Sequence, residues 1–155
     1  MTTPAVEISR RVPSLEAVVA ERLGGAAVLG RRVDSLSDLA SLVGQGLPAE
    51  AIERVRRMGH LAAGELEAII PQRTLRHRRS RGERLTPEES DRAVRLLRVQ
   101  AQAERTFGDA GKGDAWLRRP LRALDGARPI DLATTEAGAR LVEQVLAGIA
   151  WGAAA

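Results

Sequence analysis

The sequence predicts an all-α protein, and three observations support this class. Of its 155 residues only three are aromatic, two Trp and one Phe, so a core must be built from Leu, Val, Ile and Ala. Ala, which is abundant here, has the highest helix propensity of all residues. The β-branched residues stand mostly singly, without the alternation that marks strands. A chain of this length forms one domain or two small ones and can bury a core without disulfides.

The first third of the chain is predicted to form two helices after a loose tail at residues 1–13. Ser14 is a suitable N-cap for a helix that ends at the following pair of glycines. Ser35 and Asp38 have the spacing of a capping box, in which two side chains reciprocally satisfy free amides. A second, short helix is therefore expected to begin there and to end near Val43.

Three short helices are predicted next, and the third is strongly basic. Pro48 suits the first position of a helix, and a second helix extends over Leu61–Ile70. Pro71 then separates it from a helix at Gln72–Arg81. Residues 73–84 hold six arginines and one acid, a net charge of +5, which exceeds the +4 of the whole chain. This concentration of charge is typical of a surface that contacts phosphates.

The clearest local signal is Thr86-Pro87-Glu88-Glu89, which combines an N-cap threonine, a proline at the first position and a glutamate at the third. The helix that it opens should extend to Phe107. The expected elements after it are a flexible loop at Gly108–Gly113, a short helix capped by Asp114, a turn at Asp125-Gly126, a helical turn at Pro129–Ala133, and a last helix capped by Thr135 and ended by Gly152.

The basic helix is the candidate DNA-binding element. Helices of this order and length, with a basic third member, have the outline of a helix-turn-helix, whose last helix lies in the major groove. Gln72 and Arg73 would face base edges, because Gln pairs with adenine and Arg with guanine. The remaining predicted DNA-binding residues, of which most would hold phosphates, are Thr74, Arg76, His77, Arg78, Arg79 and Arg81. The alternatives are a three-helix core with an arginine-rich exposed face, or a surface for an acidic protein.

Several function classes are disfavoured. There is no Cys or Tyr, and the only two histidines, His60 and His77, lie on different segments without a catalytic or metal-binding spacing. Lys112 is followed by Gly113 where a phosphate-binding loop needs Ser or Thr. We therefore expect neither an enzyme nor a cofactor nor a metal. No apolar run is long enough to cross a membrane, and neither early apolar run resembles a signal peptide, so a cytoplasmic protein is expected.

The second half of the chain carries a series of short motifs that together resemble one family. They are Pro71-Gln72-Arg73-Thr74-Leu75, Arg78-Arg79, Leu85-Thr86, Glu89-Ser90-Asp91-Arg92, Phe107-Gly108-Asp109, Ala115-Trp116-Leu117, Leu124-Asp125-Gly126, Pro129-Ile130-Asp131-Leu132, Thr135, Gly138, Val142, Leu146 and Trp151-Gly152. In order and spacing, Ile70 to Gly152 resembles the Xre/MbcA/ParS antitoxins. Trp151 stands where Tyr is more usual.

The resemblance implies a division of labour along the chain. It implies an Xre-like helix-turn-helix at residues 35–84 and a small helical domain for toxin binding and dimerisation at residues 85–155. Residues 1–34 lie outside it, and their role is unassigned. The implied partners are a RES-domain toxin that depletes NAD, operator DNA, and a second copy of the chain within a toxin–antitoxin assembly.

The same resemblance places seven residues in the toxin-binding domain, although several of them must be core. They are Trp116, Leu117, Pro129, Leu146, Ile149, Trp151 and Gly152. The C-terminal end would cover the entrance to the toxin's active site. On spacing alone, Trp151 fits a partner surface and a staple for the last helix equally well. The alternative function is a stand-alone helix-turn-helix repressor with a C-terminal dimerisation domain.

Overall fold

The computed structural model describes residues 11–154, and the side chains of residues 11–152. The tail expected at residues 1–13 falls largely outside this range. Every named element within it is a helix, as the sequence predicted. The elements are α1 (Leu15–Arg22), α2 (Gly25–Leu29), α3 (Leu36–Gln45), α4 (Ala49–Arg57), α5 (Ala63–Ile69), α6 (Gln72–Ser80), α7 (Pro87–Phe107), α8 (Ala110–Arg118), the 3-10 turn η1 (Arg122–Leu124), α9 (Pro129–Leu132) and α10 (Glu136–Ala154).

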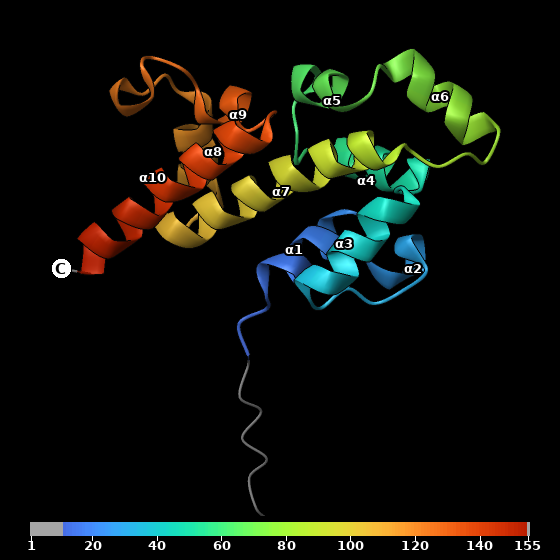
Figure 1. Cartoon of the computed structure of the whole chain (residues 1–155), viewed down its shortest axis with the longest axis horizontal. Helices are drawn as coiled ribbons and strands as arrows, with labels where there is room; N and C mark the ends of the chain where they lie inside the picture. Colours follow the sequence, from blue (N-terminus) through green and yellow to red (C-terminus); the bar gives the residue numbers. More distant parts are fainter. Residues whose placement is uncertain (1–10, 155) are drawn as a thin grey trace, which may run out of the picture.

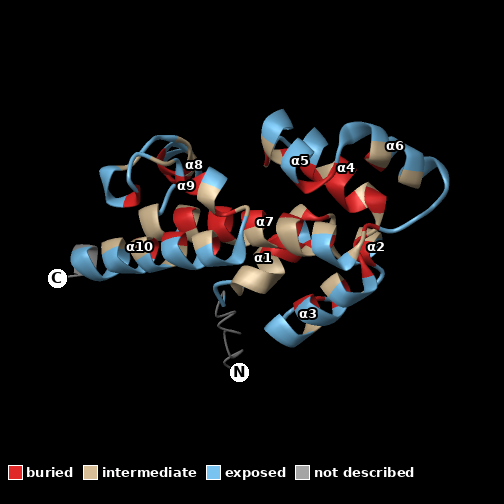
Figure 2. Ribbon diagram, turned by 45° about the horizontal axis from the view of Figure 1, so that its top comes forward, coloured by how far each residue is buried: buried red, intermediate tan, exposed pale blue. Residues whose placement is uncertain are grey.

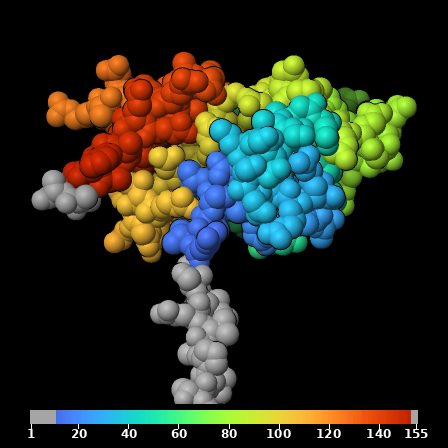
Figure 3. Space-filling model, turned by 60° about the horizontal axis from the view of Figure 1, so that its bottom comes forward, coloured from blue at the N-terminus to red at the C-terminus, as the bar shows by residue number. Residues whose placement is uncertain are grey.

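Helix α7 is the axis of the fold (Figure 1). It packs against α1, α3 and α5 towards its beginning and against α8 and α10 towards its end. Ala93, Leu97 and Ala103 on α7 are fully buried, and Figure 2 shows this helix as the most deeply buried element. Seen from another side, α1 and α3 cover one flank of α7, with α10 and α6 at opposite ends of the molecule (Figure 3). One continuous hydrophobic core therefore serves both halves of the chain.

The predicted capping signals are confirmed. The Ser35 hydroxyl accepts from the Asp38 amide at 3.1 Å while the Asp38 carboxylate accepts from the Ser35 amide at 3.1 Å. At α7, the Glu89 carboxylate accepts from the Thr86 amide at 2.8 Å, and the Thr86 hydroxyl accepts from the Glu89 amide at 3.2 Å. These boxes fix where α3 and α7 begin, because they satisfy amides that have no partner within the helix.

Three expectations about helix limits were wrong. The glycine pair after α1 does not start a loop but opens α2, which the left-handed Gly24 begins. The segment Gly108–Gly113, expected to be a flexible loop, contains the first turn of α8, which is capped by Asp109 instead of Asp114. The last helix continues past Gly152 to Ala154. None of the helices in the described range has the length and hydrophobicity to span a membrane.

A close contact joins the loop before α4 to the start of α7. The Leu85 amide donates to the Leu47 carbonyl at 2.9 Å, and the Leu47 amide donates to the buried Ser90 hydroxyl at 2.8 Å. Gly46 has a positive φ of 85°, and a Cβ there would lie 2.1 Å from the Leu85 carbonyl oxygen. This junction holds the chain on both sides of the three short helices α4, α5 and α6.

Candidate functional site

Helix α6 stands at one end of the molecule with most of its surface in solvent (Figure 2). Pro71 precedes its first turn, and Leu75 is its one buried side chain. Of the residues predicted to contact DNA, Thr74 and Arg78 are half-buried. The exposed members are Gln72, Arg73, Arg76, His77, Arg79 and Arg81. A helix anchored by one leucine and exposed on its remaining faces is able to enter a groove of DNA.

The arginines of α6 differ in what they already bind. Arg79 pairs with Glu50 at 3.3 Å, and Arg81 pairs with Glu83 at 3.1 Å, both with more than half of the arginine side chain exposed. Arg73 and Arg76 make no ion pair or side-chain hydrogen bond within residues 11–152. The positive charge available to a phosphate is therefore greatest at Arg73 and Arg76.

Arg78 has a different position from its neighbours. Its side chain is only 17% exposed and forms an ion pair with Glu89, the carboxylate that also caps α7. The guanidinium thus ties α6 to the start of α7. The sequence analysis placed Arg78 among the phosphate contacts because its partner is brought to it by the turn at residues 81–86, which a helical pattern does not reveal.

The seven residues predicted for toxin binding separate into a buried and an exposed group. Four of them lie in the core: Trp116, Leu117, Pro129 and Leu146. Trp116 packs beside Phe107 with ring centroids 5.8 Å apart. Ile149 is half-buried, whereas Gly152 is exposed and Trp151 is 79% exposed. In this chain only Ile149, Trp151 and Gly152 are accessible to a partner.

These three residues belong to an apolar surface that we call the α10 tip, residues 147–152. It consists of Ala147, Gly148, Ile149, Ala150, Trp151 and Gly152. The segment carries no charge, and it extends away from the rest of the molecule beside the C-terminus (Figure 1). An exposed tryptophan on an uncharged helical segment is typical of a protein-binding surface.

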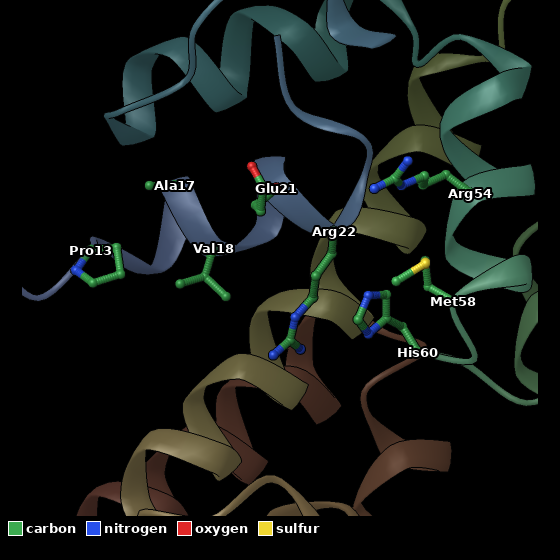
Figure 4. A pocket seen from close by; sticks show the side chains of 8 residues that line it. All are labelled: Pro13, Ala17, Val18, Glu21, Arg22, Arg54, Met58 and His60. Carbon is green, nitrogen blue, oxygen red and sulfur yellow. The ribbon is translucent and has the colours of Figure 1, made fainter. Parts of the chain in front are cut away.

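A pocket of about 510 Å³ lies between α1 and the end of α4 (Figure 4). Its lining includes Pro13, Val18, Arg54, Met58 and His60. Burial, and next the charge of Arg22, lower the pKa of His60, so the imidazole is neutral at physiological pH. No group of three metal-ligating side chains occurs among the residues that the structure describes.

Comparison with known proteins accounts for both ends of the molecule. Residues 38–98 match the antitoxin Xre-like helix-turn-helix domain, and residues 102–152 match the antitoxin Xre/MbcA/ParS C-terminal toxin-binding domain. The first match covers α4, α5 and α6, and the second covers α8 to α10. The two matches meet within α7.

Individual relatives agree with the domain matches. An antitoxin Xre of Pseudomonas putida is 36% identical over 115 residues, which is 74% of this chain and 72% of the relative. An antitoxin Xre of Yersinia enterocolitica is 34% identical over 65% of this chain and 70% of its own length. A Sphingobium protein named Prs ADP-ribosylating antitoxin is 34% identical over 52% of this chain and 56% of its own length.

Proposed function

Because the chain belongs to the Xre/MbcA/ParS family of antitoxins, we propose that it neutralises a RES-domain toxin that consumes NAD and represses its own operon through helix α6. It is an antitoxin of a toxin–antitoxin system with a helix-turn-helix domain. The matched toxin-binding domain favours this function over a stand-alone repressor. The chain then acts by binding, as a non-enzymatic regulator, and meets both partners in the cytoplasm.

The observation that supports the proposal best is the separation of two unlike surfaces along α7. The basic helix α6 lies beyond the start of α7, and the apolar α10 tip lies beyond its end (Figures 1 and 3). A duplex at one end leaves room for a protein at the other. The chain is therefore able to hold DNA and toxin at the same time.

At the DNA end, Gln72 and Arg73 stand at the start of α6, where a recognition helix meets base edges. Arg76, His77, Arg79 and Arg81 follow on the exposed part of the helix and would hold phosphates. A homodimer would present two such helices to two half-sites of an operator, as helix-turn-helix proteins do.

At the toxin end, the α10 tip supplies the contact, with Trp151 as the anchor in a pocket of the toxin. The tip would thereby close the entrance to the NAD site. The name of the Sphingobium relative refers to ADP-ribosylation of Prs, and ADP-ribosyl transfer also consumes NAD. A toxin that hydrolyses NAD and one that transfers its ADP-ribose would present the same kind of cleft to the tip.

Co-expression with the protein encoded next to this chain tests the toxin half. The full chain should form a complex and keep cellular NAD at its normal level. Deletion of residues 147–155, or the change Trp151→Ala, should release the toxin, and NAD should fall. Met58→Ala is the matched control, because Met58 is 57% exposed but lies at α4. Full protection by the truncated chain would refute the assigned role of the tip.

Titration of DNA from upstream of the chain's own gene tests the other half. The double variant Arg73→Ala/Arg76→Ala should weaken binding and reduce the salt slope by about one unit for each lost phosphate contact. Arg140→Ala, on the exposed face of α10, removes a charge far from α6 and serves as the control. An unchanged affinity and slope in the double variant would exclude these two contacts.

A further inference from the structure

One side chain of the toxin-binding half reaches the helix-turn-helix. Arg118, the last residue of α8, donates from Nε to Glu65 Oε1 and from Nη2 to Glu65 Oε2, each at 2.9 Å. The Arg118 side chain is 25% exposed and that of Glu65 is 11% exposed. A two-point arginine–carboxylate pair is the strongest and most directional form of ion pair. It joins α8, in the C-terminal match, to α5, in the N-terminal match.

The carboxylate of Glu65 also holds the start of α5. Its Oε2 atom accepts from the Ala62 amide at 2.8 Å, the reach-back contact of a capping box. Only Ile70 and Pro71 separate the end of α5 from the start of α6. The side chain that Arg118 holds therefore lies at the head of the helix that leads directly into the DNA-binding helix.

The α5–α6 pair has little else to keep it in place. Its buried side chains are Leu66, Ile69 and Leu75, with Ile70 between the helices. A cavity of about 330 Å³, which Ile52 and Leu75 help to line, lies between this pair and α4. Helices packed over a cavity have fewer contacts that fix their orientation, so the polar contacts of α5 and α6 carry more of that task.

Arg118 itself is held from behind by a buried polar chain. Its Nη1 pairs with Asp114, and Asp114 accepts from Gln100 Nε2 at 3.4 Å. Gln100 is 3% exposed and accepts from Arg22 Nη1 at 2.9 Å. Arg118 thus extends from a rigid network between α1, α7 and α8 and is not a loosely placed surface charge.

We propose that Arg118 is a positioning residue for DNA binding, which orients α5 and α6 through Glu65 and transmits the presence of toxin to the DNA-binding helix. The transmission rests on the proposed function. Helix α10 packs on α9, and α9 packs on α8, so a toxin seated on the α10 tip loads the element that ends in Arg118. Coupling of this kind changes the affinity of one site when the other is filled.

The first test needs neither partner. Arg118→Met keeps the aliphatic stem and removes the guanidinium. Amide hydrogen exchange should become faster over residues 62–80 and stay unchanged in α10. Arg98→Met is the matched control, because Arg98 pairs with Glu143 at 2.8 Å with similar exposure and touches neither α5 nor α6. Equal protection of residues 62–80 in wild type and Arg118→Met would overturn the proposal.

The second test uses upstream DNA with and without toxin. In the wild type, toxin should change the DNA affinity by about fivefold or more. Free Arg118→Met should bind DNA more weakly than the wild type with an unchanged salt slope, and toxin should alter its affinity by less than about twofold. A slope reduced by about one unit would mean that Arg118 touches a phosphate itself, and an undiminished toxin effect would mean that the signal takes another route. Either result would overturn the proposal.

A second variant guards against misfolding. Glu65→Gln preserves the capping contact with the Ala62 amide and removes the charge that Arg118 binds, so it should reproduce the loss of coupling. Toxin binding measured without DNA reports separately on the proposed function. A chain that binds toxin and DNA normally but keeps full coupling in both variants would leave the function intact and refute the role of Arg118.

Discussion

The hydroxyl of Ser90 should be worth more to stability than any other serine hydroxyl of α7 or α3. Ser90 is fully buried, donates to the Thr86 carbonyl at 2.8 Å and accepts from the amide of Leu47, which is also fully buried. Ser90→Ala leaves that amide without a partner and without water. An unsatisfied buried amide costs about 1–3 kcal/mol, while Ala gains a few tenths in helix propensity.

Thermal unfolding followed by circular dichroism measures the effect. For a chain of this length, 1 kcal/mol corresponds to about 2–4 °C, so Ser90→Ala should lower Tm by roughly 2–10 °C. Ser37→Ala, at an exposed position of α3, should stay within about 0.5 kcal/mol of the wild type. A Tm for Ser90→Ala equal to that of Ser37→Ala would refute the reasoning that this hydroxyl joins α7 to the segment before α4.

Three further results are expected. Gly46→Ala should destabilise the fold by more than about 1 kcal/mol in urea unfolding, because of its positive φ and the clash with Leu85. Leu146→Ala should cost about 2–5 kcal/mol, since Leu146 is fully buried, and at a temperature where it stays folded it should affect toxin binding less than Trp151→Ala does. Because the folded-state pKa of His60 is below its ordinary 6.5, stability should be complete above pH 6.5 and should fall as pH drops towards that lowered value, and His60→Gln should flatten this dependence in melts at about pH 7.5 to 5.5.

Local signals predicted the elements whose ends are set by local chemistry. The capping boxes at Ser35 and Thr86 gave the starts of α3 and α7, because both partners of a box lie three residues apart in the sequence. Pro71 gave the break between α5 and α6 for the same reason. The all-α class followed from composition alone.

Elements whose shape depends on distant residues were missed. Gly113 was read as part of a flexible loop, but a Cβ there would lie 2.7 Å from the Glu104 amide nitrogen. The glycine allows α8 to pack directly against α7, and only the packed structure makes this visible. A propensity scale counts such a residue as a helix breaker.

The candidate site shows the same boundary between local and distant information. That α6 is basic and exposed could be predicted from the charge of residues 73–84. That Arg78 is occupied by Glu89, and that Arg118 holds Glu65 across 53 residues, could not, since no periodicity links these positions. Burial likewise separated Leu146 from Trp151, which the sequence grouped together.

The meeting of the two domain matches inside α7 has a geometric consequence. An α-helix turns by about 100° and rises about 1.5 Å with each residue. A single residue inserted between the two matched regions would therefore rotate the toxin-binding end around the axis relative to the DNA-binding end. The length of α7, counted in residues, sets the angle at which a bound toxin stands on the duplex. Exchanging toxin specificity between relatives would require joining their halves in helical phase, as two gears are meshed.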